Sequence, residues 1–206
     1  MKILLGSQSP RRRELLAGLD VDFRVVAIDA DEHYPEGLQG GEIPYFISRA
    51  KAEAYGEPLA EDEVLLTADT IVWVPCEGGK SGVMLGKPRD EEEARRMLRL
   101  LSGRMHAVYT GVTLRTREGM QTIVDKTEVW FRALTEEEIA YYVAKYQPLD
   151  KAGAYGVQEW IGYVGVTKIV GSYFNVMGLP VERVWEEIRK AKGREVFDVL
   201  GNAVVR

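Results

Sequence analysis

HAVYTGVTL (106–114) and TIVDKTEVWF (122–131) are the two stretches that decide the fold. Both are long, and the first is rich in β-branched residues, which is typical of β-strands. The segment between them, 115–121, has the composition of a turn and is too short for a helical crossover. We therefore expect an antiparallel hairpin, and with it a mixed sheet rather than an all-parallel one.

Short apolar runs and helical patterns alternate along the rest of the chain, which indicates an α/β fold without a regular βαβ repeat. No linker, low-complexity tract or internal repeat divides the sequence, so we expect one domain over residues 1–206. Gly18 is expected to close the first helix, and Thr135 with Glu138 forms a capping box for a later one. The expected strands are 3–5, 23–28, 64–74 and 157–169 (broken by Gly162 and Gly165), and the expected helices are 10–17, 44–55, 91–101, 135–145 and 181–190.

The composition limits the classes of function. The formal net charge is −5, which argues against coating a nucleic-acid polymer, because that requires a broad basic face. The chain has one cysteine, Cys76, and two histidines, His33 and His106. A disulfide within the chain and a Cys-rich zinc site are therefore excluded, and two histidines make a Ser-His-Asp triad difficult to assemble. The first residues lack a secretory apolar core, and no run approaches the roughly 20 apolar residues of a membrane span, so we expect a cytoplasmic protein with no membrane partner.

The segment SQSPRR (7–12) follows the first expected strand. Ser9 is a preferred helix N-cap and Pro10 a preferred first helical residue, so a helix is expected to begin here. The free N–H groups of a helix start, together with two guanidinium groups, suit phosphate oxygens. An ordinary capped helix with solvated arginines fits the segment equally well, and the sequence leaves both interpretations open.

Asp69 lies in the middle of an apolar run, LLTADTIV (65–72). An ionised carboxylate is costly to bury unless it is paired or bound to a metal ion. Carboxylates that deprotonate water or hold a metal ion are often placed in this way. A bulge between two shorter strands would also explain the residue, and the pattern alone does not decide between them.

Other charged or small residues are weaker signals when each is taken alone. The acidic cluster 29–32 suits a hard divalent cation, although such a run is more often a solvated surface. Lys51 lies in an expected helix, where it could equally be a surface lysine, and Lys87 lies in a tight Gly-Lys-Pro loop. The segment 151–158 is rich in small residues, which allows close approach of its backbone to a ligand.

Taken together, these segments resemble the Maf family of nucleoside triphosphate pyrophosphatases. The resemblance runs over nearly the whole chain, and the motifs are specific in this order and spacing although each is weak alone. The segments that carry it are LLGSQSPRRRELL (4–16), AKA (50–52), ADT (68–70), GKP (86–88), LSG (101–103), YTGV (109–112), DKAGAYG (150–156), GSY (171–173) and VMGLP (176–180).

The resemblance implies an elongated mixed α/β fold with two lobes, a nucleotide cleft between them and commonly a homodimer. It also implies cleavage of the α–β phosphoanhydride of a nucleoside triphosphate, to the monophosphate and pyrophosphate, with a divalent cation such as Mg²⁺ or Mn²⁺. Asp69 corresponds to the catalytic acid–base residue, and Glu32 and Asp69 correspond to the metal ligands. The residues that correspond to the substrate-binding set are Ser7, Ser9, Arg11, Arg12, Lys51, Lys87 and Lys151.

Three positions distinguish the branches of the family. Arg12, Thr70 and Gln158 resemble the branch that acts on dTTP and UTP. A neutral Gln amide both donates to and accepts from a pyrimidine edge, whereas a carboxylate suits the donor edge of guanine. The chain departs from the family pattern at Gly6, which is usually Ala, and at Glu159-Trp160, where Gly is common. The second departure lies beside the expected base pocket.

The resemblance leaves three other functions open. Maf proteins are also associated with arrest of septum formation, so a nucleotide-binding regulator of cell division is one alternative. A 7-methyl-GTP-type pyrophosphatase is another, and an enzyme that removes modified pyrimidine nucleotides is a third. A panel of nucleotides with detection of released pyrophosphate separates these functions.

Overall fold

The computed structural model describes residues 2–76 and 81–192. Its centre is a seven-stranded sheet with the strand order β2-β1-β3-β5-β6-β7, and β4 pairs with β3 beside that path. The strands are β1 (Lys2–Gly6), β2 (Phe23–Val25), β3 (Glu63–Pro75), β4 (Gly82–Leu85), β5 (Met105–Arg115), β6 (Met120–Phe131) and β7 (Val166–Val170). The helices are α1 (Pro10–Ala17), α2 (Glu42–Ala54), α3 (Glu91–Leu101), α4 (Glu136–Tyr146), α5 (Trp160–Gly165), α6 (Tyr173–Met177) and α7 (Val181–Lys192), with 3₁₀ turns η1 (Pro148–Asp150) and η2 (Ala152–Ala154).

The hairpin expected from residues 106–131 is confirmed. β5 and β6 pair antiparallel in continuous register, from Met105 opposite Trp130 to Arg115 opposite Met120. β1 pairs parallel with both β2 and β3, whereas β3 pairs antiparallel with β4 and β5. The sheet is therefore mixed, as the short turn between the two apolar runs predicted.

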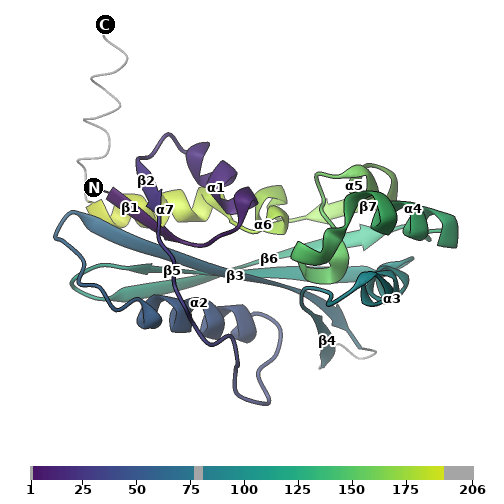
Figure 1. Ribbon diagram of the computed structural model, residues 1–206, viewed down its shortest axis with the longest axis horizontal. Coiled ribbons are helices and arrows are strands. Elements are labelled where there is room, and N and C mark those ends of the chain that lie inside the picture. Colours follow the sequence, from purple (N-terminus) through teal and green to yellow (C-terminus); the bar gives the residue numbers. More distant parts are fainter. Residues whose placement is uncertain (1, 77–80, 193–206) are drawn as a thin grey trace, which may run out of the picture.

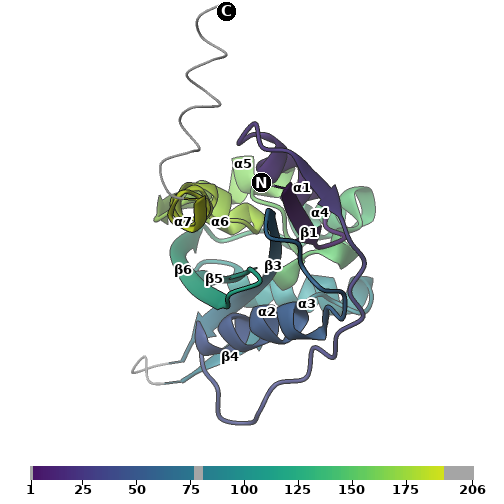
Figure 2. The same cartoon turned by 90° about the vertical axis from the view of Figure 1, so that its left-hand side faces the viewer.

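The long strands β3, β5 and β6 run along the length of an elongated molecule (Figure 1). α2 covers one face of the sheet, and α1, α6 and α7 cover the other (Figure 1 and Figure 2). α3, α4 and α5 pack at the end of the long strands that lies away from β1 and α1 (Figure 1). The α/β class and the elongated mixed sheet flanked by helices are thus confirmed.

Two of the hydrophobic clusters in the described residues lie toward the two ends of the long strands. Alternate residues of 64–68 in β3 pack with α1 and α7 in the first core. Val72 and Val74, further along β3, pack with α3, α4 and α5 in the second. Asp69 and Thr70 lie between these two sets, so the polar pair is placed where one core ends and the next begins.

Two helix starts follow the capping patterns of the sequence. The Ser9 hydroxyl accepts from the backbone N–H of Arg12 at 3.4 Å, Pro10 opens α1, and Gly18 closes it. At the start of α4, Thr135 and Glu138 form the expected capping box. Both helices therefore begin where side chains satisfy their free N–H groups.

Two strand predictions are wrong in part. The expected strand 157–169 is interrupted, because residues 160–165 form α5 and only β7 is extended. An added Cβ at Gly162 would lie 1.8 Å from the Val157 carbonyl oxygen, so this glycine permits a turn that other residues would not. The strand expected at 23–28 ends at Val25, opposite Leu5, because β1 itself ends one residue later.

Four short elements have no counterpart among the predicted ones. β4, α6 and the two 3₁₀ turns each contain five residues or fewer, which is too short for a hydrophobic period to be recognised. Across residues 2–76 and 81–192, no helix has both the length and the apolar character that crossing a bilayer requires.

Candidate active site

An open stretch of strand edge positions the candidate site. β1 pairs with β3 as far as its last residue, Gly6, which lies opposite Thr67. The chain then leaves the sheet. β4 takes up the same edge of β3 from Val72 onward, while β5 pairs with the other edge throughout this region. Within the described chain, residues 68–71 therefore have one edge that no strand covers.

A cavity of about 370 Å³ includes this part of β3 in its wall. The wall also includes the end of β1, the start of α1 and residues from the segments 150–158 and 176–178. The structure therefore brings together segments that are far apart in the sequence. Every site residue predicted from the sequence lines this cavity: Ser7, Ser9, Arg11, Arg12, Glu32, Lys51, Asp69, Thr70, Lys87, Lys151 and Gln158.

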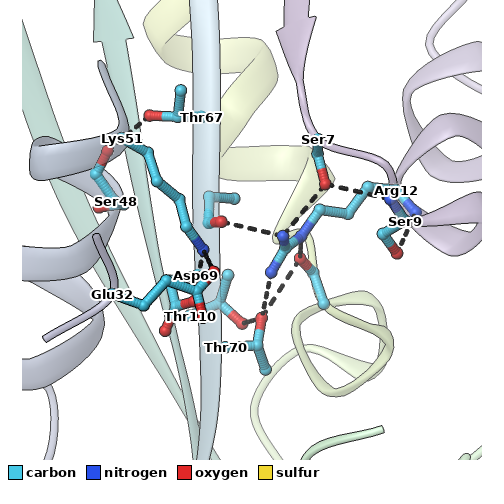
Figure 3. A network of polar contacts seen from close by, with 12 residues as sticks. Ser7, Ser9, Arg12, Glu32, Ser48, Lys51, Thr67, Asp69, Thr70 and Thr110 are labelled. Atoms are coloured by element: carbon cyan, nitrogen blue, oxygen red, sulfur yellow. Dashed lines mark hydrogen bonds and ion pairs between the residues drawn. The ribbon is translucent and has the colours of Figure 1, made fainter. Parts of the chain in front are cut away.

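Asp69 meets Lys51 of α2 on one side of β3 (Figure 3). The Lys51 Nζ atom lies 2.9 Å from Asp69 Oδ1 and 2.8 Å from Glu32 Oε1. The side chains of Lys51 and Asp69 are each 14% exposed, whereas that of Glu32 is 59% exposed. β3 and β5 keep continuous register across Asp69, so the residue lies in a regular strand and not in a bulge. One ammonium group thus joins two carboxylates in the cavity wall.

Glu32 and Asp69 are the residues that could hold a metal ion. Burial acts to raise the pKa of Glu32, but the hydrogen bond and charge of Lys51 outweigh it. The charges of Lys87 and Arg12 act in the same direction as Lys51, so the pKa of Glu32 is lowered overall. Glu32 is therefore ionised at neutral pH. No cluster of three or more His, Cys, Asp or Glu side chains suited to a metal ion occurs in the described residues, so other ligands would have to come from water or substrate.

Arg12 lies on the other side of β3 and is held by uncharged oxygen atoms (Figure 3). Its Nε atom donates to the Gly178 carbonyl at 2.8 Å, and Nη1 donates to the Ala68 carbonyl at 2.9 Å. Nη2 donates to the Thr70 hydroxyl, also at 2.9 Å. Burial lowers the pKa of Arg12, while the charge of Asp69 acts in the opposite direction. An arginine remains protonated in proteins, so a positive charge of fixed orientation lines the cavity.

Ser7 and Ser9 shape the loop that leads from β1 into α1. The backbone N–H of Ser9 donates to the Ser7 hydroxyl at 3.3 Å, and Arg12 Nη1 donates to the same hydroxyl at 3.3 Å. Ser9 in turn caps α1. The two interpretations of this segment are therefore compatible, because a capped helix start forms part of the cavity wall.

A second cluster of charges joins α1 to the segment after α4. Arg11 Nη1 lies 2.6 Å from Asp150 Oδ2, and Lys151 Nζ lies 2.7 Å from Asp150 Oδ1. Lys151 Nζ also lies 3.1 Å from Glu159 Oε1, and its side chain is only 9% exposed. The sequence assigned no role to Asp150, and Glu159 stood out only as a departure from the family pattern. The charge of Lys151 is thus enclosed by carboxylates.

Lys87 and Gln158 line the cavity with polar atoms that lack partners among the described residues. The Lys87 ammonium forms no hydrogen bond or ion pair with any residue of 2–76 or 81–192. In the same part of the chain, the buried Oε1 atom of Gln158 accepts no hydrogen bond. A buried acceptor without a partner is rare in proteins, and a bound ligand or water molecule would satisfy it.

A buried polar network behind Thr70 was missed by the sequence analysis. The hydroxyls of Thr70 and Thr110 lie 3.0 Å apart, and Thr110 donates to the Asn175 carbonyl at 3.2 Å. The Asn175 side chain donates to Thr127 at 3.0 Å, so α6 is anchored to the sheet. Gly178 caps the C-terminus of α6; its carbonyl accepts from Arg12, and its φ of 113° favours glycine. The motifs GSY (171–173) and VMGLP (176–180) were the only signals for this element.

The two histidines take no part in the cavity wall within the described chain. His106 is fully buried in β5, where its Nε2 atom lies 2.8 Å from the Tyr155 hydroxyl. Burial lowers the pKa of His106 to about 3, so the ring is neutral under ordinary conditions. His33 is exposed and contacts Asp31.

Comparisons with known proteins show the family of the chain. A family model described as Maf-like protein matches residues 2–191. A protein named dTTP/UTP pyrophosphatase from Bacteroides fragilis is 55% identical over 190 residues, which cover 92% of this chain and 95% of that protein. A protein of the same name from Bacteroides thetaiotaomicron is 53% identical with the same coverage. A solved dITP/XTP pyrophosphatase from Mycobacterium abscessus is a distant match, with 17% identity, a TM-score of 0.38 and coverage of 71% of this chain and 96% of that one. On the family model and the two curated relatives, the chain belongs to the Maf family.

Proposed function

We propose that this chain hydrolyses dTTP and UTP at the α–β phosphoanhydride and releases pyrophosphate and the nucleoside monophosphate. One observation carries the proposal: Asp69 and Arg12 line one cavity from the two sides of β3, at the open edge 68–71. The name dTTP/UTP pyrophosphatase, borne by relatives of 55% and 53% identity, supports the choice of substrates.

The charges that line the cavity suit a triphosphate together with a divalent cation. Among the described residues, five basic and three acidic side chains line it, which leaves a net charge of +2. A nucleoside triphosphate brings about four negative charges near neutral pH, and these must be neutralised before a nucleophile can approach. One divalent cation would balance the remainder. The basic residues are Arg11, Arg12, Lys51, Lys87 and Lys151, and the acidic ones are Glu32, Asp69 and Asp150.

Glu32 and Asp69 fit the role of metal ligands, because oxygen atoms of both converge on a single cation, the Lys51 ammonium. Mg²⁺ is commonly held by one or two carboxylates, with water and substrate phosphates as further ligands, so two carboxylates suffice. A bound Mg²⁺ or Mn²⁺ would supply positive charge against the phosphate oxygens. Lys51 would then be released from at least one carboxylate and could contact a phosphate.

Asp69 is the proposed general base. Lys51 holds its Oδ1 atom at 2.9 Å, which gives the carboxylate a fixed direction in the cavity wall. From there it would orient and deprotonate a water molecule aimed at the α-phosphorus. Arg12 and Lys87 would hold phosphate oxygens and stabilise the negative charge that grows on the departing pyrophosphate.

Arg12, Thr70 and Gln158 are the proposed selectors of the nucleotide. Arg12 and Thr70 bond to each other at 2.9 Å, so a larger side chain in place of Thr70 would also move the guanidinium. Gln158 contributes an amide whose buried oxygen has no partner within the described residues. An amide that both donates and accepts suits the edge of uracil or thymine.

Residues 1–206 are proposed to form one domain that acts in the cytoplasm as a homodimer. β3 pairs with β1 from the start of the chain and with β5 from its middle, which supports a single folding unit. The dimer and the location rest on the resemblance to the family. Sedimentation equilibrium of the purified protein tests the dimer, and a monomer at micromolar concentration would contradict it.

A panel of nucleoside triphosphates tests the proposed reaction. The purified protein is incubated with Mg²⁺ or Mn²⁺ and with dTTP, UTP, GTP, 7-methyl-GTP or modified pyrimidine triphosphates, and both pyrophosphate and orthophosphate are measured. We expect pyrophosphate, with dTTP and UTP among the best substrates. Release of orthophosphate would contradict the bond assignment, and a preference for 7-methyl-GTP would contradict the substrate. Binding without any turnover would favour a regulatory protein.

A further inference from the structure

The carboxylate of Glu159 lies inside the turn made by its own segment. Its Oε2 atom accepts the hydroxyl hydrogen of Tyr142, which projects from α4. The same Tyr142 oxygen accepts the backbone N–H of Gly156 at 3.0 Å, and the backbone N–H of Glu159 donates to the Gly156 carbonyl at 3.0 Å. Gly156 and Glu159, which lie before and after Gln158 in the sequence, are therefore linked both directly and through Tyr142.

Gly156 provides the space that this arrangement needs. An added Cβ at Gly156 would lie 2.8 Å from Cδ and 2.9 Å from Oε2 of Glu159, which is closer than side-chain carbons approach in proteins. The carboxylate is thus packed against the backbone as well as hydrogen-bonded. Tyr142 is fully buried, and burial, with the adjacent Glu159, raises the pKa of its hydroxyl. Tyr142 therefore stays a proton donor to Glu159.

The contacts of Glu159 continue through Lys151 and Asp150 to α1. Its Oε1 atom lies 3.1 Å from Lys151 Nζ, which lies 2.7 Å from Asp150 Oδ1. The second oxygen of Asp150 lies 2.6 Å from Arg11 in α1. Burial acts to raise the pKa of Asp150, but Lys151 and Arg11 lower it overall. An unbroken series of ionic contacts therefore joins the segment of Gln158 to the start of α1.

Glu159 itself is not part of the cavity wall in the described chain, so its role would be exerted through its neighbours. Two of these, Gln158 and Lys151, line the cavity. We propose that Glu159 is a positioning residue for nucleotide selection: its carboxylate holds the segment 151–158 so that Gln158 meets the base while Arg11 and Lys151 stay in register with the phosphates. This inference rests on the proposed hydrolysis of dTTP and UTP.

Glu159→Gln is the direct test, because the amide can still accept from Tyr142 but no longer carries the charge that holds Lys151. Loss of one charge-assisted hydrogen bond corresponds to about a tenfold change in the equilibrium constant for nucleotide binding. We expect the KM for dTTP to rise about tenfold while kcat changes less than about threefold. The ratio of kcat/KM for dTTP to that for dGTP should fall. Unchanged KM and unchanged selectivity would overturn the proposal.

Two further variants separate positioning from general stability. Tyr142→Phe removes only the hydroxyl that holds Glu159 and Gly156. It should also lower the ratio of kcat/KM for dTTP to that for dGTP. Glu138→Gln is the matched control, since Glu138 also lies on α4 and pairs with Arg132 at 2.7 Å but does not line the cavity. It should lower the melting temperature without changing selectivity. An equal loss of selectivity in Glu138→Gln would show that any weakening of α4 has this effect, and would contradict the proposal.

A double-mutant cycle tests whether Glu159 acts through Gln158. In a Gln158→Ala background, Glu159→Gln should cause no further loss of selectivity, whereas an independent effect would add. The same proteins are compared by equilibrium binding of dTTP and dGTP. If the wild-type protein binds but cleaves neither nucleotide, the proposed reaction fails, yet the ratio of the two Kd values still decides the role of Glu159.

Discussion

Lys51 and Arg12 lie on the two sides of β3 at one cavity, and they are held in opposite ways. Lys51 lies between two carboxylates, those of Glu32 and Asp69. Arg12 donates to two backbone carbonyls and two hydroxyl groups, and no carboxylate of the described chain forms an ion pair with it. The first cation is neutralised by its neighbours, whereas the second keeps an unbalanced charge in a rigid position.

This difference supports the proposed division, in which the Lys51 side of β3 reacts and the Arg12 side binds. A carboxylate pair around one cation suits water activation and metal binding, while a fixed guanidinium suits phosphate oxygens. Consecutive strand residues point to opposite faces of a sheet, so Asp69 and Thr70 belong to different sides of β3. The open edge at 68–71 lets both sides line one cavity.

Removing the base should have the largest effect. Asp69→Asn keeps the shape of the side chain but cannot accept a proton, so kcat should fall at least ~100-fold while nucleotide binding changes little. Steady-state kinetics and equilibrium binding measure the two quantities. Near-normal turnover of dTTP would show that the Lys51 side of β3 is not the reacting side.

The binding side should be sensitive to the shape of its cation. Arg12→Lys retains the charge but loses the fork that contacts Ala68, Thr70 and Gly178, so kcat/KM for dTTP should fall about 30-fold. Arg11→Lys is the matched control, since the charge of Arg11 is already paired with Asp150, and it should cost only about threefold by the same reasoning. Equal effects would remove the distinction between free and paired cations.

Nucleotide choice should respond to a single charge at the cavity wall. Gln158→Glu replaces an amide with an acceptor-only carboxylate, so kcat/KM for dTTP and UTP should fall about tenfold. Gln121→Glu is the control for the same chemical change, at an exposed position on β6, and it should leave both values unchanged. An unaltered substrate profile in Gln158→Glu would exclude this residue from base recognition.

The smallest expected effect concerns stability rather than activity. Burial lowers the pKa of His106 from its ordinary value of 6.5 to about 3. Between pH 6.5 and about pH 3, His106 is therefore protonated in the unfolded chain but neutral in the folded protein. The free energy of unfolding falls as the pH drops through this window, by up to about 1.4 kcal/mol per pH unit. Urea unfolding between pH 7 and pH 5 should show a shallower pH dependence in His106→Gln. An identical slope would contradict a neutral buried ring.

Much of the sheet could be predicted because its signals are local. The apolar runs of β3, β5 and β6 are long, and the caps at Ser9 and Thr135 mark helix starts in the sequence itself. α5 could not be predicted in this way, because its six residues carry no helical period and its turn depends on Gly162 facing the Val157 carbonyl.

The site was predicted only in part, for a related reason. Lys51 and Asp69 were ambiguous alone, and it was the order of motifs along the whole chain that joined them. The ion pairs of Asp150 and Glu159 and the open edge of β3 depend on contacts between distant segments. No local pattern records such contacts, so the sequence did not show that two carboxylates enclose Lys151.

The position of bond cleavage tests the account most directly. The protein hydrolyses dTTP in water enriched in ¹⁸O, the two products are separated, and the ¹⁸O content of each is measured by mass spectrometry. If Asp69 directs water to the α-phosphorus, the label appears in dTMP and the pyrophosphate is unlabelled. Label in pyrophosphate, or release of orthophosphate and dTDP, would contradict the account.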